Sequence, residues 1–493
     1  MAIAQGKYHI WTVGCQMNEA DSQRVAAIMD DLGWEDVPTM SEANLVILNT
    51  CSVREAPELK AHGQLSLLRH AKKKRTDLLV AVMGCMIGNQ RTIDDLKKRY
   101  PAVDLFLKVE QADILPKFLE ERWNPLATGD GCVDIEEPHT IGSDRMMPML
   151  PLAPEPIPTM SFTPMSITPR PAARDLSYPT RLQDEQRKPT AWLPVILGCN
   201  KVCSYCIVPS RRGRERSRPV DELLTETRQL VTKGAKDITL LGQTVEAYGL
   251  DLPGQPTLSE LMAQLSDIEG LERIRFMTSY PRHMTDNMIH EMASLPKVCE
   301  HVNIPVQHGT DAMLERMRRG YTLAEYRTLI DKLRRWWPGV ALSTDVIVGF
   351  CGETDDEFEQ VLQLLREIRF DLVHVAMYSP RPGTLSFKWD DDVPLALKKE
   401  RLHAVEEVQQ VIALEWNQLL IGTSQEILIE ESQLQGEQRL WKGRTRSNKL
   451  VFCPAKGAAT DLKVGDLAMV DIERVTAWSL QGEVKQTAKV LAH

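Results

Sequence analysis

Six apolar segments, each followed by an amphipathic helical pattern, occupy the central part of this 493-residue chain and constrain its fold more than any other feature. They lie near 193–197, 237–241, 273–278, 302–306, 342–348 and 373–378. The intervening stretches, such as DEFEQVLQLLREI, are apolar at i, i+3 and i+4, which predicts helices. Six strand–helix units without the last two of a full barrel predict an open (β/α)6 barrel, and a long helix from about Leu395 to Leu420 follows it.

A second, shorter series of the same kind precedes the central one. Apolar strands are predicted at 8–13, 45–48, 78–83 and 103–107, and a helix from about Glu19 to Leu32. Continuous apolar runs separated by helices indicate a parallel α/β sheet. We therefore expect an N-terminal α/β domain at 6–124 and a central domain at 191–418.

The segment between these domains, 130–190, has a different composition. Eleven prolines fall between residues 131 and 190, mixed with Met, Ser and Thr and with little periodicity. Such a composition does not build a core, so it predicts an extended linker.

The C-terminal segment 420–488 alternates apolar and polar residues in short runs divided by Gly and Asn, which predicts a small antiparallel β-barrel. Small barrels often bind oligonucleotides. Trp441 and Phe452 offer stacking surfaces here, and four cations surround them: Lys442, Arg444, Arg446 and Lys449. An ordinary solvated charged face explains the same composition equally well.

Three cysteines close together predict a reactive site directly after the first central strand. Cys199, Cys203 and Cys206 form a CxxxCxxC triplet. An iron–sulfur cluster is normally held by four Cys, so three thiolates leave one iron open to a cofactor or substrate. A structural zinc site would need a CxxC pair and two nearby ligands, and no such partner pair follows. The triplet also lies on the C-terminal face of the predicted barrel, where active sites occur.

A second set of cysteines follows the predicted strands of the N-terminal domain. Cys15, Cys51 and Cys85 each lie one to three residues beyond a strand end. Because the carboxyl ends of parallel strands open on one edge of the sheet, the three thiols can converge there. The alternative is three unrelated buried cysteines, since free Cys is often buried.

Composition indicates the compartment in which we expect the protein and the partners that it can bind. The N-terminus lacks a secretory leader and no run of about 18 apolar residues occurs, so we expect a cytoplasmic protein without a membrane partner. Ten Cys in a reducing compartment favour metal binding or catalysis over disulfides. The net charge of −9 restricts RNA binding to local basic patches, of which one follows the CxxxCxxC loop: Arg211, Arg212 and Arg214.

Together these motifs resemble the radical S-adenosylmethionine methylthiotransferases over nearly the whole chain except the Pro-rich linker. The match begins with GCNKVCSYCIVP at 198–209 and continues at LLGQ ending at Gln243, TSYP at 278–281, PVQHGTD at 305–311, RRGYT at 318–322, TDVIVGFCGET at 344–354 and YSPRPGT at 378–384. The run GRTRSNKLV at 443–451 is similar to the RNA-binding TRAM barrel of the tRNA-modifying MiaB type. Four positions depart from the family pattern: Thr244, Tyr280, His308 and Cys351.

The resemblance implies two [4Fe–4S] clusters and S-adenosylmethionine. Cys199, Cys203 and Cys206 would be the catalytic ligands of the cluster that cleaves the cofactor to a 5′-deoxyadenosyl radical, which an inert aromatic C–H bond requires. The other three cysteines would hold an auxiliary cluster. Place and family match together suggest four cofactor-binding residues: Gln243, Gln307, Gly349 and Arg381. Gly349 is equally well explained by a strand-to-helix turn that needs a small residue.

The implied reaction adds a methylthio group to C2 of an N(6)-isopentenyladenosine beside the tRNA anticodon. Implied partners are tRNA, a low-potential electron donor such as flavodoxin or ferredoxin, and a sulfur donor. One alternative is the same chemistry on threonylcarbamoyl-adenosine tRNA or on a ribosomal protein. Another is an RNA-binding iron–sulfur protein without catalysis.

Overall fold

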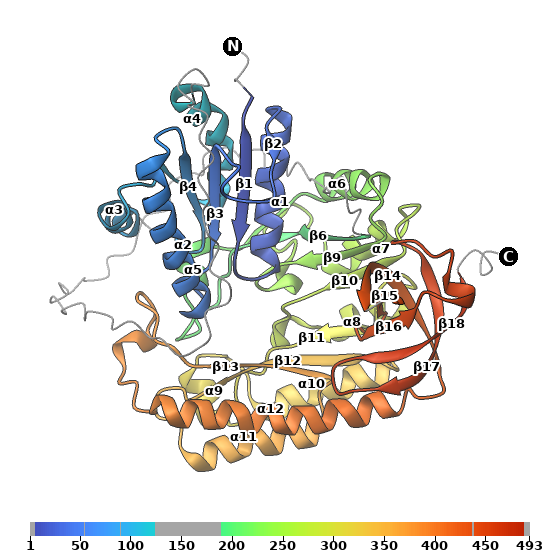
Figure 1. Cartoon of the computed structure of the whole chain (residues 1–493). Coiled ribbons are helices and arrows are strands. Elements are labelled where there is room, and N and C mark those ends of the chain that lie inside the picture. Colours follow the sequence, from blue (N-terminus) through green and yellow to red (C-terminus); the bar gives the residue numbers. More distant parts are fainter. Residues whose placement is uncertain (1–4, 54, 89, 124–188, 436–437, 488–493) are drawn as a thin grey trace.

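The computed structural model describes residues 5–53, 55–88, 90–123, 189–435 and 438–487, and these form three units (Figure 1). An N-terminal sheet domain packs on a central half-open barrel, and a small C-terminal barrel lies at the other side of the central unit. The predicted linker lies outside the described residues up to residue 188.

The N-terminal domain is built on a five-stranded parallel sheet of order β2-β1-β3-β4-β5. Its strands are β1 (Lys7–Thr12), β2 (Glu35–Asp36), β3 (Leu45–Thr50), β4 (Leu79–Gly84) and β5 (Leu105–Phe106). The helices are α1 (Gln16–Asp31), α2 (Glu55–Lys74), α3 (Gln90–Arg99) and α4 (Leu115–Arg122), with a 3-10 turn η1 (Val109–Ile114) before the last. Strands β3 and β4 are buried at every position because apolar clusters cover both sheet faces.

Two details of this domain differ from the sequence prediction. Helix α1 begins at Gln16 rather than near Glu19, because Cys15 occupies the position that precedes the first helical turn. The edge strand β2 was not predicted, since two polar residues carry no periodic signal.

The central unit is an open (β/α)6 barrel of parallel strands, as predicted. Its strands are β6 (Thr190–Pro194), β9 (Asp237–Leu241), β10 (Arg273–Phe276), β11 (His301–Asn303), β12 (Ala341–Val348) and β13 (Leu372–Met377). They form two three-stranded sheets, β10-β9-β6 and β11-β12-β13, joined by a single parallel bridge between Ile274 and Val298. The short strands β7 (Ile196–Leu197) and β8 (Arg216–Ser217) pair with each other and enclose the CxxxCxxC loop and helix α5 (Val208–Arg212).

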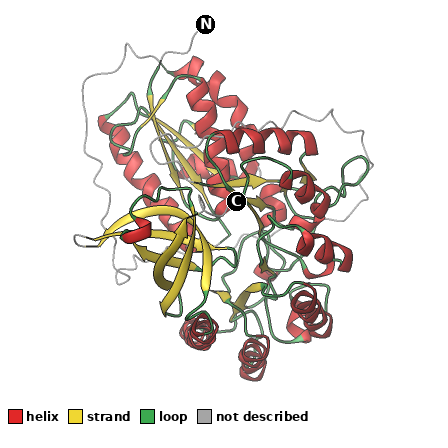
Figure 2. Cartoon of the chain, turned by 90° about the vertical axis from the view of Figure 1, so that its right-hand side faces the viewer, coloured by secondary structure: helices red, strands yellow, loops and turns green. Residues whose placement is uncertain are grey.

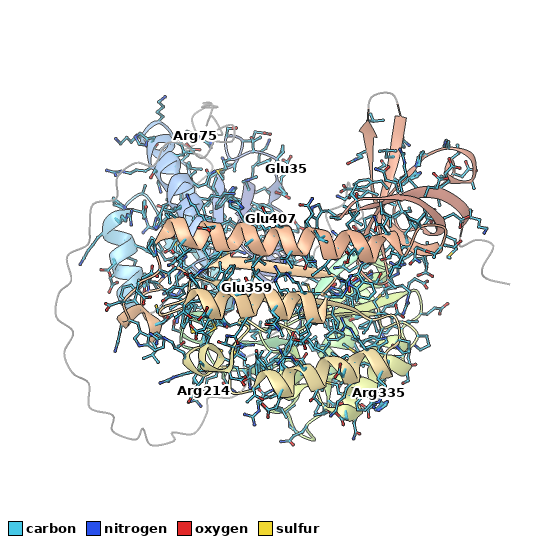
Figure 3. The ribbon with its side chains drawn as sticks, turned by 90° about the horizontal axis from the view of Figure 1, so that it is seen from below. Glu35, Arg75, Arg214, Arg335, Glu359 and Glu407 are labelled. Atoms are coloured by element: carbon cyan, nitrogen blue, oxygen red, sulfur yellow. The ribbon has the colours of Figure 1, made fainter. Side chains whose placement is uncertain are left out.

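The outer helices of this unit are α6 (Val220–Thr232), α7 (Leu258–Ser266), α8 (Asp286–Ser294), α9 (Asp311–Arg316), α10 (Leu323–Trp336), α11 (Asp355–Ile368) and α12 (Leu395–Gln418). Three of them begin with a Thr and Glu capping box, at Thr257, Thr322 and Thr354. Figure 3 shows α11 and α12 side by side, with the exposed Glu359 and Glu407 on them. Among the described residues, no helix combines the length and apolar character needed to cross a membrane.

The C-terminal unit is a closed barrel of five strands, seen in yellow at the left of Figure 2. Its strands are β14 (Ser424–Gln435), β15 (Gln438–Thr445), β16 (Leu450–Pro454), β17 (Leu467–Val475) and β18 (Leu480–Thr487). The prediction of an antiparallel barrel was wrong for one pair, because β16 and β18 run parallel. A ring with an odd number of strands cannot alternate direction at every step, so one such pair is required.

The turn between β15 and β16 docks on the N-terminal ends of the central strands. Arg446 forms a forked ion pair with Glu300, which directly precedes β11, with an Nη2 to Oε1 distance of 2.9 Å. Lys449 Nζ lies 2.8 Å from an oxygen of Asp371, directly before β13. Arg275 in β10 donates to two backbone carbonyls of the same turn. The barrel therefore covers the end of the central unit opposite the CxxxCxxC loop.

Candidate cluster and cofactor site

The first cysteine triplet lies on the loop that follows β7. Cys199 is buried, and Cys203 and Cys206 are partly exposed. Gly198 precedes the triplet with a φ of +77°, and a Cβ there would lie 2.2 Å from the carbonyl oxygen of Arg214. Only glycine fits this position, and it turns the chain so that the loop folds back over the strand ends.

Hydrogen-bond donors surround these thiols. The Lys201 backbone NH lies 3.4 Å from Cys199 Sγ, and Thr244 Oγ1 lies 3.5 Å from the same atom. Burial raises the pKa of Cys206 to about 12, and the backbone NH of Val208 partly opposes that rise. Thiols of this kind stay protonated until a metal displaces the proton, which suits a ligand rather than a free nucleophile.

Arg319 is the principal functional residue that the sequence prediction did not assign. Its side chain is buried, and Nη1 lies 3.4 Å from Cys203 Sγ. The other donors reach the Pro305 carbonyl and the Tyr321 hydroxyl, at 3.0 Å each. None of these three partners is a carboxylate, and of the two that can ionise, a thiol is ordinarily more acidic than a phenol.

The second triplet also converges, as the strand ends predicted. Cys15 follows β1, while Cys51 and Cys85 directly follow β3 and β4. Both other thiols act electrostatically on Cys85, and a Cβ on Gly14 would lie 3.0 Å from Cys51 Cβ. Cys15 is exposed, whereas Cys51 and Cys85 are buried, so the group opens on one side.

A polar network fixes the second triplet. Asn18, buried in α1, accepts from Cys15 Sγ at 3.4 Å and donates to the Thr50 carbonyl at 3.0 Å. Arg212 donates to Asp21 at 2.9 Å and lies within hydrogen-bonding reach of Cys85. Burial raises the pKa of Cys85 to about 11, and Arg212 acts against that rise.

Each triplet suits a cubane cluster better than a single ion. The described residues contain no group of three or more His, Cys, Asp or Glu side chains placed to hold one metal ion. A cubane differs because each thiolate binds a separate iron, so the three sulfurs need not meet at one point. The six thiols, with NH and guanidinium donors around them, fit two such clusters with three protein ligands each.

The two triplets are neighbours because the N-terminal domain packs on the C-terminal end of the central strands. Met17 and Ala20 of α1 bury themselves against Leu197 and Leu241, near the CxxxCxxC loop. Polar contacts between the two units join Glu19 to Trp192, at 3.0 Å, Glu55 to Ser379, at 3.3 Å, and Glu58 to Arg381, at 2.7 Å. A small cavity at this contact is lined by Cys85, Leu197, Arg211 and Arg212, among others.

The four predicted cofactor-binding residues have different surroundings. Gln243 follows β9, and its buried Oε1 has no hydrogen-bond partner within the described residues. Gln307 has a φ of +75° and bridges to Val346. A Cβ on Gly349 would lie 2.3 Å from Lys398 Cγ, which favours the turn explanation for that glycine. Arg381 pairs with Glu58, but its buried Nε and Nη2 have no partner among the described atoms.

The seven predicted RNA-binding residues also lie in different surroundings. Arg211 and Arg212 point into the contact between the first two units, whereas Arg214 is exposed. Lys442 and Arg444 pair with Glu431 and Glu430 on the C-terminal barrel. Arg446 and Lys449 hold that barrel to the central unit, as described above. Trp441 is buried with its Nε1 donating to the Ala459 carbonyl, so it offers no stacking face.

The four positions that depart from the family pattern lie in two places. Thr244 touches Cys199, and the hydroxyl of Tyr280 donates to the Arg319 carbonyl, so both border the first triplet. His308 and Cys351 are fully buried. His308 Nε2 lies 3.4 Å from Glu353 Oε2, and the Cys351 thiol contacts Tyr378, so these two act within the packing of the barrel.

Comparisons with known proteins agree with this geometry. The radical SAM superfamily model matches residues 193–365, an uncharacterized protein family (UPF0004) matches 7–108, and the TRAM domain matches 418–485. The chain is 39% identical over 97% of its length to the tRNA-2-methylthio-N(6)-dimethylallyladenosine synthase of Chloroflexus aurantiacus, covering 91% of that protein. It is 38% identical over 97% of its length to the enzyme of the same name from Dictyoglomus thermophilum, covering 98% of it.

Among solved structures, the radical S-adenosylmethionine methyltransferase TsrM from Kitasatospora setae is similar in fold. It aligns with a TM-score of 0.51 at 14% identity, over 78% of this chain and 77% of that one. At this identity the likeness supports the architecture alone.

Proposed function

Because the chain belongs to the family of tRNA-2-methylthio-N(6)-dimethylallyladenosine synthases, we propose that it adds a methylthio group to C2 of an N(6)-isopentenyladenosine in tRNA. It is a radical S-adenosylmethionine enzyme, which implies S-adenosylmethionine and a [4Fe–4S] cluster. The names of these relatives agree with this substrate and not with threonylcarbamoyl-adenosine, a ribosomal protein or a non-catalytic role.

One observation supports the proposal most strongly: two groups of three cysteines flank the same contact between the N-terminal domain and the central unit. We assign Cys199, Cys203 and Cys206 to the cluster that binds S-adenosylmethionine, and Cys15, Cys51 and Cys85 to an auxiliary cluster. When bound, the first cluster would supply one-electron cleavage of the cofactor, and the second would hold the sulfur to be transferred. Three protein ligands leave one iron of each cluster free for these tasks.

The residues of the chain prepare the site for this chemistry. Gln243 Oε1 and two nitrogens of Arg381 are buried without a partner among the described atoms, and we propose that they bind the polar groups of the cofactor. The packing of α1 against Leu197 and Leu241 keeps water away from the space beside the first triplet. Arg214, Lys442 and Arg444 are our candidates for contacts with tRNA phosphates. The match to the TRAM domain supports tRNA as the substrate, and the electron and sulfur donors stay predictions.

Single substitutions in each triplet test the proposal. Full-length protein reconstituted anaerobically should convert isopentenylated tRNA to its methylthio derivative with dithionite and S-adenosylmethionine. Cys203→Ala should abolish 5′-deoxyadenosine formation, whereas Cys51→Ala should retain it and lose methylthio transfer. Both products are measured by mass spectrometry.

The control is Cys453→Ala, which removes a buried thiol from the core of the C-terminal barrel, in β16. It should retain both reactions. Retention of methylthio transfer by Cys51→Ala would refute the auxiliary assignment, and the reverse pattern of losses would exchange the roles of the two triplets.

A further inference from the structure

We propose that Arg212 raises the reduction potential of the auxiliary cluster and fastens that cluster to the loop that holds the other one. The inference rests on the proposed function, since it requires a cluster at Cys15, Cys51 and Cys85. It gives Arg212 a different role from the contact with tRNA phosphates that its sequence neighbourhood predicted.

The contacts of Arg212 support this role. Its side chain is 9% exposed, and Nη2 lies 2.9 Å from Asp21 Oδ2 and 3.5 Å from Asn18 Oδ1. The guanidinium lies within hydrogen-bonding reach of Cys85 and acts electrostatically on Cys15 as well. Arg212 and Cys85 line the same small cavity. The cation is therefore turned to the thiols and away from solvent.

Charge explains why a cation belongs there. A cluster with three thiolate ligands is anionic, and reduction adds one more negative charge. A buried anion is costly unless a partner compensates it. A fixed guanidinium in hydrogen-bonding contact stabilises the reduced form more than the oxidised form, so it raises the reduction potential.

The position of Arg212 in the chain explains how the auxiliary cluster would be linked to the loop that holds the other cluster. It ends helix α5, which begins two residues after Cys206, and the backbone NH of Val208 in that helix bonds to Cys206. At a helical rise of about 1.5 Å per residue, the six steps from Cys206 to Arg212 span roughly 9 Å. One short segment thus contacts a ligand of each cluster.

Asp21 provides a test of the direction in which the reduction potential shifts. Its carboxylate pairs with Arg212 inside the protein and partly offsets the cation's field at the cluster. Removing Arg212 should make the auxiliary potential more negative, whereas removing Asp21 should make it more positive. A purely structural ion pair predicts equal loss of thermal stability for both and no opposed shifts.

The measurement uses the full-length chain with Cys199, Cys203 and Cys206 replaced by Ala, so that only the auxiliary cluster is present. Iron and sulfide content and an EPR-monitored reductive titration are recorded for that chain and for Arg212→Gln, Arg212→Lys and Asp21→Asn. We expect a negative shift for Arg212→Gln, a positive shift for Asp21→Asn, and a smaller shift for Arg212→Lys, which keeps the charge. Arg214→Gln is the matched control, because it removes the same charge from an exposed neighbour, and it should leave the spectrum and potential unchanged.

Shifts of the same sign in Arg212→Gln and Asp21→Asn, or no shift in either, would overturn the inference. If Arg212→Gln retains no cluster, Asp21→Asn decides alone: a positive shift supports the proposal, and any other result contradicts it. If the chain without further substitution binds no cluster at Cys15, Cys51 and Cys85, the proposed function fails, which is a distinguishable result.

Discussion

Single residues beside the thiols influence the chemistry of these sites, and the motifs that contain these residues do not reveal this role. Arg319 reaches Cys203 and Arg212 reaches Cys85, so one buried guanidinium lies beside each triplet. Hydrogen bonds and charge next to the sulfurs are among the main means by which a protein adjusts a cluster. The two sites therefore share a guanidinium beside a cysteine thiol, although the folds around them differ.

Glu246 gives a prediction at the same scale. It lies in the short turn η3 (Val245–Ala247), is buried, and accepts the backbone NH of Tyr280 at 3.0 Å. Burial raises the pKa of this carboxyl from 4.5 to about 7. Between pH 4.5 and about 7 this carboxyl is ionised in the unfolded chain and protonated in the folded chain. The free energy of unfolding therefore falls as the pH rises through this range, and the loss persists above pH 7.

Glu246→Gln stays neutral and should remove this penalty. We expect it to stabilise the protein at pH 8 by an amount on the order of 3 kcal/mol, with little effect at pH 5. Urea unfolding followed by circular dichroism at both pH values checks the difference. Glu407→Gln, on the exposed face of α12, should show no such pH dependence, and an equal gain at pH 5 would contradict the explanation.

At the scale of elements, the turn between β15 and β16 joins two domains. Its cations and carbonyls meet the N-terminal ends of the central strands through Glu300, Asp371 and Arg275. A basic run in a small barrel predicts RNA binding, yet two of its four cations, Arg446 and Lys449, bind the central unit. A basic run in the sequence therefore does not show whether its side chains contact RNA or another domain of the protein.

Salt dependence separates the two roles. Lys442→Gln should reduce the slope of log K for tRNA against log salt by about 1, because it would remove the phosphate contact proposed for Lys442. Arg446→Gln should leave that slope unchanged and lower the unfolding temperature through loss of its contacts with Glu300 and Val298. Filter binding at several salt concentrations gives the slopes. An equal reduction by both variants would place Arg446 on the RNA.

At the scale of the whole molecule, the domain order places both triplets in one contact. Helix α1 packs against Leu197 and Leu241 at the C-terminal ends of central strands. Helix α2 contacts the loop after β13 through Glu55 and Glu58. Glu58 lies between Arg381 and Arg211, and it holds the two units together at the edge of the proposed cofactor site. We therefore expect this contact to influence whether cofactor cleavage leads to transfer.

Glu58→Ala should uncouple the two reactions. A partly exposed ion pair contributes about 1 kcal/mol, which corresponds to roughly fivefold more of the open arrangement. We expect the ratio of 5′-deoxyadenosine to methylthio product to rise by up to about fivefold. Quantifying both products in one assay gives the ratio. Glu35→Ala, on the outer edge strand β2 and exposed, should leave the ratio unaltered, and an unchanged ratio in Glu58→Ala would refute the coupling.

Much of the fold and the location of both cysteine triplets at strand ends could be predicted from the chain alone. Strand and helix periodicity predicted both parallel units, and a cysteine after each of three strand ends predicted that these thiols meet. An added signal is available in the Gly–Cys pairs at 14–15, 84–85 and 198–199, where each glycine has a positive φ. Such local features follow from short-range backbone geometry, which the sequence encodes directly.

Only the tertiary structure decided how distant groups pair. Arg319 lies 116 residues from Cys203, and Arg212 lies 191 residues from Asp21, so no local pattern connects either pair. The same holds for Arg446 and Glu300, 146 residues apart. The helices, the strands and the places of the cysteines at strand ends were determined by the sequence because they depend on neighbours along the chain. The choice of charge partner depends on packing across domains, where burial makes one long-range contact far stronger than the exposed alternatives.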